Sequence, residues 1–129
     1  MTMKTLHILI GLTLVVALAT AAGAQTAPPV LNPIGPQSVD EGQVLLIHVT
    51  STDADATIPV LSTSALPANA VFVDSGNGAG SLTFAPDFTQ AGPYSITFFA
   101  ADAVTIDTAS EIVSITVNNV NRTPVITDP

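Results

Sequence analysis

The sequence predicts an all-β protein, a Greek-key sandwich of two sheets, and three observations support this prediction. After residue 25, apolar and polar residues alternate in short runs, which is the period of a half-buried strand. These runs are separated by Pro, Gly, Asn and Asp, which favour turns. The same region lacks the spacing of an amphipathic helix. Seven such runs with turn signals between them are typical of a sandwich domain of about 100 residues.

The first 24 residues are predicted to be a signal peptide. Lys4 precedes an uncharged apolar run from Leu9 to Ala21, and Ala22-Gly23-Ala24 has the small-x-small pattern of a cleavage site. The alternative is an uncleaved membrane anchor, because the apolar stretch approaches spanning length when its flanks are included. Cleavage would leave 129 − 24 = 105 residues, enough for one domain that is secreted or held at the cell surface.

Each expected strand is placed by its apolar phase. A leading edge strand is expected near Val30 to Ile34, because its prolines are tolerated where a missing N–H costs little. The other six strands are expected at Val44–Ser51, Ile58–Thr63, Ala70–Asp74, Ser81–Ala85, Tyr94–Ala100 and Ile112–Asn118. The side chains expected to face the core are Leu45, Ile47, Val49, Leu82, Phe84, Tyr94, Ile96, Phe98, Ala100, Val113, Ile115 and Val117. His48 falls on the opposite phase and is expected to face solvent.

The charge of the predicted mature chain disfavours several kinds of partner. Without the signal peptide, Arg122 is its one Lys or Arg against ten Asp and Glu residues, a net charge of 1 − 10 = −9. Nucleic acids and anionic lipids are bound by clustered Lys and Arg, so neither is an expected partner. The only expected membrane contact is through the signal segment, if it is uncleaved. The chain has no cysteine, and a sandwich of this size can be stable without disulfides.

Two segments resemble a known family. The run from Phe84 to Asp102 resembles the second half of bacterial Ig-like and dystroglycan-type cadherin-like repeats, and Ser64 to Phe72 resembles their Leu-Pro turn leading into a strand. The resemblance covers Pro29 to Pro124. It implies a seven-stranded Ig-like or cadherin-like sandwich that acts as a structural or adhesive module. Tyr94 lies where such sandwiches often place a corner tyrosine bonded to nearby backbone.

The end of the chain echoes its beginning. Pro124-Val125-Ile126-Thr127-Asp128-Pro129 resembles Pro29-Val30-Leu31-Asn32-Pro33, about one sandwich length later. We therefore expect one repeat over residues 25–121, and a linker with the start of a second repeat over residues 122–129. The expected partners are neighbouring repeats of a longer chain or another cell-surface protein.

The resemblance to cadherins implies a calcium site, since cadherins hold ions between repeats with carboxylate and carbonyl oxygens. Asp53-Ala54-Asp55 matches the cadherin Asp-x-Asp pair, and Asp102 resembles the aspartate that follows the penultimate strand. In an Ig-like topology these loops emerge at one end, so Asp53, Asp55 and Asp102 are the implied metal ligands. The alternative is ordinary loop chemistry, because Asp hydrogen-bonds its own backbone in turns.

A second set of implied ligands lies at the opposite end. It consists of Glu41, Asp87, Asn119 and Asn121. Glu41 resembles the cadherin glutamate, Asp87 the aspartate of the Asp-Arg-Glu motif, and residues 119–124 the linker Asp-x-Asn-Asp-Asn-x-Pro. Thr89 replaces the glutamate of the Asp-Arg-Glu motif, and Arg122 replaces a linker aspartate. Because a cation at Arg122 opposes binding of another cation, a complete cadherin site is not expected here.

The predicted domain is not expected to be an enzyme. It has one histidine, His48, and no motif for a nucleophile elbow, a metalloprotease helix or a phosphate loop. The alternative function is a carbohydrate- or ligand-binding accessory module of a larger extracellular protein or enzyme, with Phe88 and Phe99 as stacking rings. The Gly-rich stretch Asp74–Gly80 is expected to form a hairpin loop rather than a calcium-binding repeat.

Overall fold

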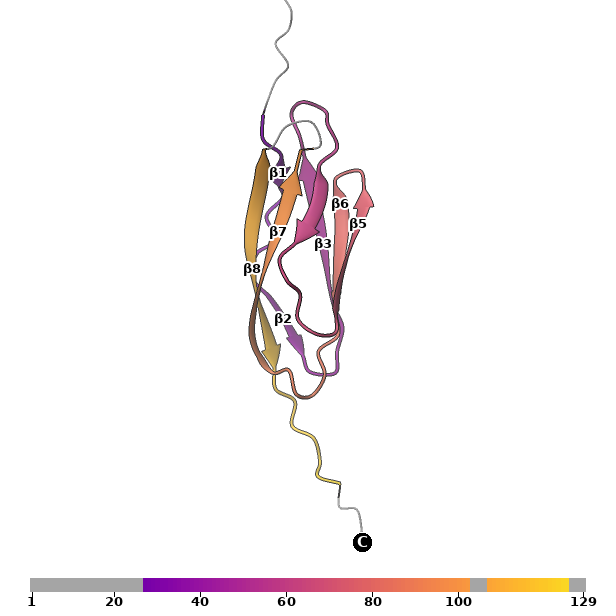
Figure 1. The fold of residues 1–129 in the computed structure, drawn as a ribbon. Coiled ribbons are helices and arrows are strands. Elements are labelled where there is room, and N and C mark those ends of the chain that lie inside the picture. The colour runs from indigo at the N-terminus through magenta and orange to yellow at the C-terminus, as the bar shows by residue number, and fades with distance from the viewer. Residues whose placement is uncertain (1–26, 103–106, 126–129) are drawn as a thin grey trace, which may run out of the picture.

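The protein is a two-layered β-sandwich in the computed structural model, which describes residues 27–102 and 107–125 (Figure 1). Its strands are β1 (Val30–Leu31), β2 (Gln37–Asp40), β3 (Leu45–Thr52), β4 (Val60–Thr63), β5 (Ala70–Gly76), β6 (Ala79–Phe84), β7 (Gly92–Ala101) and β8 (Thr108–Asn118). One sheet has the order β1-β3-β6-β5 and the other β2-β8-β7-β4. The predicted all-β sandwich is therefore confirmed. The predicted signal peptide, residues 1–24, lies outside the described residues. The described part of the chain also contains no helix of the length and apolarity that a membrane crossing needs.

The strand predicted at Val30–Ile34 is shorter than expected, and a strand that was not predicted follows it in the other sheet. β1 pairs with β3 in one sheet, and β2 pairs in parallel with β8 in the other. The connection between β1 and β2 contains Gly35, whose φ is 71°, and Pro36. The carboxylate of Glu111 holds this crossing, because it accepts the backbone N–H of Ile34 at 2.9 Å and of Gly35 at 3.1 Å. The described fold thus has eight strands where seven were predicted.

Local residue preferences account for the hairpin between β5 and β6. β5 and β6 are joined by Asn77-Gly78, whose positive φ angles of 55° and 67° are those of a tight two-residue hairpin turn. The predicted hairpin in the Gly-rich stretch is therefore confirmed. β7 and β8 form the longest ladder, from Gly92↔Val117 to Ala101↔Thr108.

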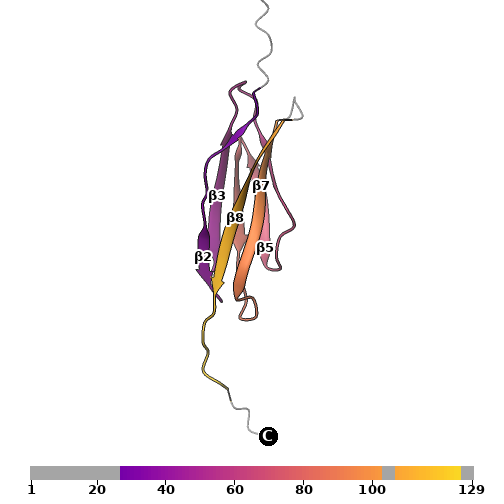
Figure 2. The same ribbon diagram turned by 90° about the vertical axis from the view of Figure 1, so that its left-hand side faces the viewer.

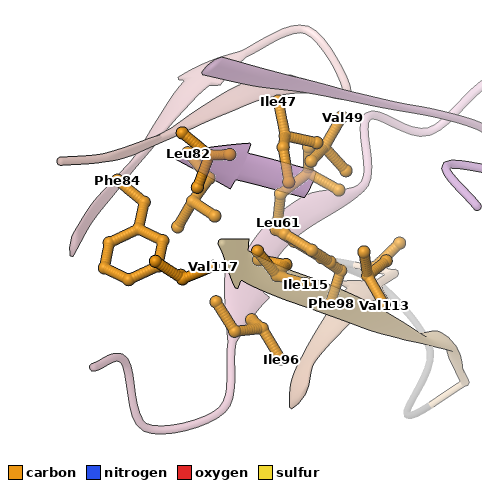
Figure 3. Packing of buried hydrophobic residues seen from close by; sticks show 12 residues of the cluster. Ile47, Val49, Leu61, Leu82, Phe84, Ile96, Phe98, Val113, Ile115 and Val117 are labelled. Atoms are coloured by element: carbon orange, nitrogen blue, oxygen red, sulfur yellow. The ribbon is translucent and has the colours of Figure 1, made fainter. Parts of the chain in front are cut away.

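The core contains the inward rows that the alternation predicts (Figure 3). Its buried members are Val39, Ile47, Val49, Leu61, Leu82, Phe84, Ile96, Phe98, Ala100, Val113, Ile115 and Val117, with Leu45 and Tyr94 partly buried against them. Two ring pairs make edge contacts, Phe72–Phe98 at 5.8 Å and Phe84–Tyr94 at 5.4 Å between centroids. The Tyr94 hydroxyl donates to the Gln90 carbonyl at 2.9 Å, so the predicted corner tyrosine is confirmed.

The chain enters the sandwich at one end and leaves at the other (Figures 1 and 2). We call the entry end the N-terminal pole; it carries residue 27, the β3–β4 loop (53–59), the β5–β6 turn and Asp102. The exit end, called the C-terminal pole, carries the β2–β3 turn (41–44), the β6–β7 loop (85–91) and residues 119–125. Both sets of predicted metal ligands therefore lie at the poles, the first set at the N-terminal pole and the second at the C-terminal pole.

Candidate functional sites at the two poles

The β3–β4 loop at the N-terminal pole is folded around the side chains of two aspartates. Asp53 Oδ1 accepts the backbone N–H of Asp55 at 2.7 Å, and Ala56, with a φ of 59°, completes the turn. Asp55 Oδ2 accepts the backbone N–H of Ala27 at 3.0 Å. One oxygen of each aspartate thus accepts a hydrogen bond from a backbone N–H. The bond from Ala27 to Asp55 joins the entering chain to the loop.

Four oxygens of this same segment are buried without a hydrogen-bond partner in the described part of the chain. They are Ser51 Oγ, Asp53 Oδ2, Asp55 Oδ1 and Thr57 Oγ1. Buried polar atoms are nearly always hydrogen-bonded, and an unpaired carboxylate oxygen is especially costly to bury. Ser51, only 6% exposed, lies on the inward phase of β3, on the same side as Val49. Carboxylate and hydroxyl oxygens are hard ligands, so the segment has the chemistry that suits a cation such as Ca²⁺.

Sequence analysis identified the two aspartates but missed the two hydroxyls. Ser51, Asp53, Asp55 and Thr57 occupy alternate positions, so the inward phase of β3 continues into the loop. That alternation was the available signal. It was obscured because Ser and Thr are ordinary residues on the exposed side of strands and in turns.

The third predicted ligand of this set, Asp102, lies at the same pole. It directly follows Ala101, which pairs with Val60 at the start of β4, so Asp102 comes beside the end of the β3–β4 loop. Asp102 is 6% exposed, and its backbone N–H donates to the Asp107 carbonyl at 3.0 Å. Within residues 27–102 and 107–125, no three Asp, Glu, His or Cys side chains gather closely enough to hold a metal ion. A cation bound by Asp53 and Asp55 would therefore depend on hydroxyl and carbonyl oxygens as well.

Glu41 at the C-terminal pole is a buried carboxylate whose two oxygens both accept backbone N–H groups. Oε1 accepts from Ala91 at 2.9 Å and Oε2 from Val120 at 3.0 Å, while the Glu41 backbone N–H donates to the Asn118 carbonyl at 3.0 Å. At 3% exposure, this side chain joins the β2–β3 turn, the β6–β7 loop and the segment after β8. The geometry therefore gives the Glu41 carboxylate a structural role, because both of its oxygens are engaged by backbone N–H groups.

Asp87, the second predicted ligand at this pole, caps its own loop. Its Oδ1 accepts the Thr89 hydroxyl at 2.6 Å and the Thr89 backbone N–H at 2.8 Å, and these bonds lower the pKa of the Asp87 carboxyl below its ordinary value. Thr89, which replaces the glutamate of the cadherin motif, thus serves this capping. The two remaining predicted ligands, Asn119 and Asn121, are exposed.

The two phenylalanines considered as sugar-stacking rings lie at opposite ends of β7. Phe88 precedes the strand, is 40% exposed, and has the Arg122 guanidinium carbon 4.1 Å from its ring centroid. Phe99 lies near the far end of β7, is half-buried, and stands between Ser62 and Ser110 across the sheet. The two rings therefore do not form one platform. His48 is exposed on the outer side of β3, as predicted.

Comparison with known proteins identifies the fold. Neither a protein-family model nor a curated protein sequence matches this chain. Among solved structures, it is similar to the sialic acid binding region of a Streptococcus sanguinis SK1 adhesin, with a TM-score of 0.63 and 13% identity over 73% of this chain and 30% of that one. It is also similar to the titin M3 domain, with a TM-score of 0.54 and 13% identity over 70% of this chain and 97% of that one.

A third similar structure is an endo-fucoidan hydrolase of glycoside hydrolase family 107, with a TM-score of 0.60 and 14% identity over 72% of this chain and 14% of that one. The chain thus matches a small part of the adhesin and hydrolase structures and almost the whole titin domain. The chain has an Ig-like fold. Identities this low show the fold alone, so the bacterial cadherin-like family named from the sequence remains a prediction.

Proposed function

We propose that this protein is an exported, non-catalytic Ig-like module that acts as a structural or adhesive repeat at the cell surface or outside the cell. The observation that carries the proposal is that the chain enters at one pole and leaves at the other, which suits modules joined end to end (Figure 2). The likeness to an adhesin region and to a titin domain supports this role. The partners proposed are neighbouring repeats or another cell-surface protein, and export depends on the signal peptide predicted at residues 1–24.

The proposal includes calcium at the N-terminal pole, bound by Asp53 and Asp55 with Asp102 nearby. Its support is the set of buried unpaired oxygens on Ser51, Asp53, Asp55 and Thr57. A cation there would neutralise two carboxylates and would be coordinated by oxygens that accept no hydrogen bond. It would also fix the entering chain, because Asp55 already holds the Ala27 backbone. Calcium would thus stiffen the entry to the module. At the opposite pole, the oxygens of Glu41 are engaged by backbone, so the proposal does not extend to Glu41, Asp87, Asn119 and Asn121.

The test is thermal unfolding of residues 25–129 in EDTA, in millimolar calcium and in millimolar magnesium. A ligand that binds only the folded state raises its stability by RT ln(1 + [L]/Kd), about 2.7 kcal/mol at 100 times Kd. We expect calcium to raise the melting temperature and magnesium to raise it less, because Mg²⁺ demands a tighter octahedral site. An equal effect of both ions would mean general charge screening.

Variants locate the ion. Asp53→Asn and Asp55→Asn should abolish the calcium-dependent rise, and Asp102→Asn tests whether the third predicted ligand contributes. Asp40→Asn is the matched control, because Asp40 is an exposed carboxylate at the other pole. If calcium has no effect on the wild type, or if Asp40→Asn removes the effect as well, the calcium part of the proposal is wrong and an ion-independent Ig-like spacer remains.

The alternative function is a carbohydrate- or ligand-binding accessory module of a larger extracellular protein or enzyme. It is favoured by the nature of two similar structures, a sialic acid binding adhesin region and a fucoidan hydrolase. Against it, Phe88 and Phe99 do not share a surface, and Arg122 covers one face of the Phe88 ring. Binding of the purified module to a glycan array, lost in Phe99→Ala and retained in Phe88→Ala, would favour this alternative over the spacer.

A further inference from the structure

The segment that leaves the sandwich is held against the C-terminal pole by two contacts after β8 has ended. The first is the hydrogen bond from the Val120 backbone N–H to Glu41 Oε2 at 3.0 Å. The second is the Arg122 guanidinium over the Phe88 ring, with its central carbon 4.1 Å from the ring centroid. We call the residues of these contacts, Glu41, Phe88, Val120 and Arg122, the exit anchor.

The exit anchor is built on backbone that is itself fixed. Glu41 is buried and also holds the Ala91 backbone, so the carboxylate that receives Val120 cannot move freely. The Phe88 ring points toward Gly42, where an added Cβ would lie 2.7 Å from the ring tip, so the absence of a side chain at Gly42 makes room for the ring. Contacts of this kind restrict the direction in which the chain leaves, because a guanidinium over a ring and a charged hydrogen bond both have defined geometry.

The start of the module is anchored at a comparable place. The Ala27 backbone N–H is bound by Asp55 Oδ2, two residues before Pro29. In the sequence echo between the two ends of the chain, Pro124 corresponds to Pro29, a period of 124 − 29 = 95 residues. Two residues before Pro124 is Arg122, which therefore corresponds to Ala27.

From these positions we infer that the C-terminal pole is a docking surface for a second module of the same kind, joined through a single residue. Arg122 would be fixed to the first module by its side chain and to the second by its backbone, bound as Ala27 is bound. Only Asn121 separates it from Val120, and one residue spans at most about 3.6 Å. The two modules therefore abut, with no flexible linker between them. This inference rests on the proposed function as a repeat module.

Charge sets a condition on this partner. The N-terminal pole carries Asp53, Asp55 and Asp102, and the C-terminal pole carries Asp40 and Asp87, so two modules meeting end to end bring like charges together, which is repulsive unless a cation lies between them. Arg122 is the one Lys or Arg of the predicted mature chain, and it lies where these poles would meet. Its positive charge would offset part of this repulsion.

The first experiment measures the exit anchor in the existing chain. Backbone ¹⁵N relaxation of residues 25–129 in EDTA should give order parameters near 0.85 for residues 119–122, as in the strands, where a free tail would fall below about 0.6. Phe88→Leu and Arg122→Gln should lower the values for residues 121 and 122, Arg122→Lys should lower them less, and the control Phe99→Leu should leave them unchanged. Mobile residues 120–122 in the wild type, or variants without effect, would overturn the exit anchor.

The second experiment tests the partner. A tandem protein with residues 29–125 placed directly after Thr123 reproduces the inferred period, and the lack of native cysteines allows a spin label at Ser114→Cys in each copy. We expect a narrow distance distribution that broadens in Arg122→Gln and when four Gly and Ser residues are inserted after Asn121. A broad distribution in the parent tandem would overturn end-to-end docking even if the exit anchor is rigid. Because both experiments are done in EDTA, loss of the calcium proposal would leave their outcome unaffected.

Discussion

The two poles of the sandwich both bury acidic side chains, but their oxygens are engaged differently. At the C-terminal pole, both oxygens of Glu41 accept backbone N–H groups from segments 50 and 79 residues away in sequence. At the N-terminal pole, Asp53 and Asp55 each use one oxygen for backbone, and the other is buried without a hydrogen-bond partner among the described residues. Burial of a carboxylate therefore does not by itself indicate a metal site; the state of its second oxygen separates a structural acid from a candidate ligand.

The largest expected effect is in the core that lies between the poles. Ile115→Ala removes a fully buried side chain and should destabilise the fold by about 2–5 kcal/mol through the cavity it leaves. The loss should be the same in EDTA and in calcium, since the core does not belong to either pole. Chemical denaturation measures it, with Ile112→Ala as the control, because Ile112 is 70% exposed on the same strand. Equal losses in the two variants would show that the inward phase of β8 has been assigned wrongly.

The next effect contrasts the poles directly. Glu41→Gln leaves a backbone N–H facing an amide NH₂ group and should cost about 1–3 kcal/mol in EDTA. Asp53→Asn keeps an oxygen for the Asp55 N–H and removes a buried unpaired charge, so it should cost nothing in EDTA or should stabilise the fold. Denaturation of both variants in EDTA tests this difference. A loss in Asp53→Asn as large as that in Glu41→Gln would mean that the two poles use their carboxylates alike.

A smaller effect is expected from the glycine beneath the exit anchor. Gly42 has a φ of 77°, and an added Cβ would lie 2.7 Å from the tip of the Phe88 ring. Gly42→Ala should therefore cost about 1–2 kcal/mol from the left-handed backbone and should also displace Phe88 from Arg122. Gly35→Ala is the matched control, because Gly35 has a similar φ but open space around it. We expect both variants to lose stability and only Gly42→Ala to change the relaxation of residues 121 and 122. Relaxation changes in both variants would contradict this expectation.

The smallest effect is the pH dependence of the Asp87 cap. The Thr89 hydroxyl and backbone N–H hold the pKa of Asp87 below its ordinary value in the folded state. A carboxyl with a lowered folded pKa stabilises the fold above its unfolded pKa, about 3.9, and this contribution is lost as the pH falls through the lower folded value. Because Asp87 is fully exposed, the effect should be slight. NMR titration of its carboxyl in the wild type and in Thr89→Ala tests the cause, since the variant should titrate closer to the ordinary value.

The sequence predicted the middle of the molecule better than its ends. The inward rows on β3, β6, β7 and β8 were predictable because alternation along a strand is a local property, visible without knowing the partner strand. The crossing from β1 to a further strand in the other sheet was not, because the connection is held by Glu111, which binds the Ile34 and Gly35 backbone from 77 and 76 residues away. A long-range hydrogen bond of this kind leaves no local pattern.

The same distinction applies to the candidate sites. Asp53, Asp55 and Asp102 could be placed at one pole because topology fixes where loops emerge. The roles of Ser51 and Thr57 depend on burial, which the sequence does not give for residues in a loop. The pairing of Glu41 with Val120 likewise depends on a contact across 79 residues, and resemblance alone suggested a metal ligand instead.

The parallel pairing of β2 with β8 has a mechanical consequence. β2 follows the entry of the chain and β8 precedes its exit, and the two strands run in the same direction between opposite poles. Tension applied between the ends of the module therefore pulls β2 toward the entry pole and β8 toward the exit pole. The hydrogen bonds of the four pairs from Gln37↔Ile115 to Asp40↔Asn118 are then loaded in shear, all at once, and cannot open one after another as a zipper does. A module built in this way resists stretching along its axis until these four pairs separate together.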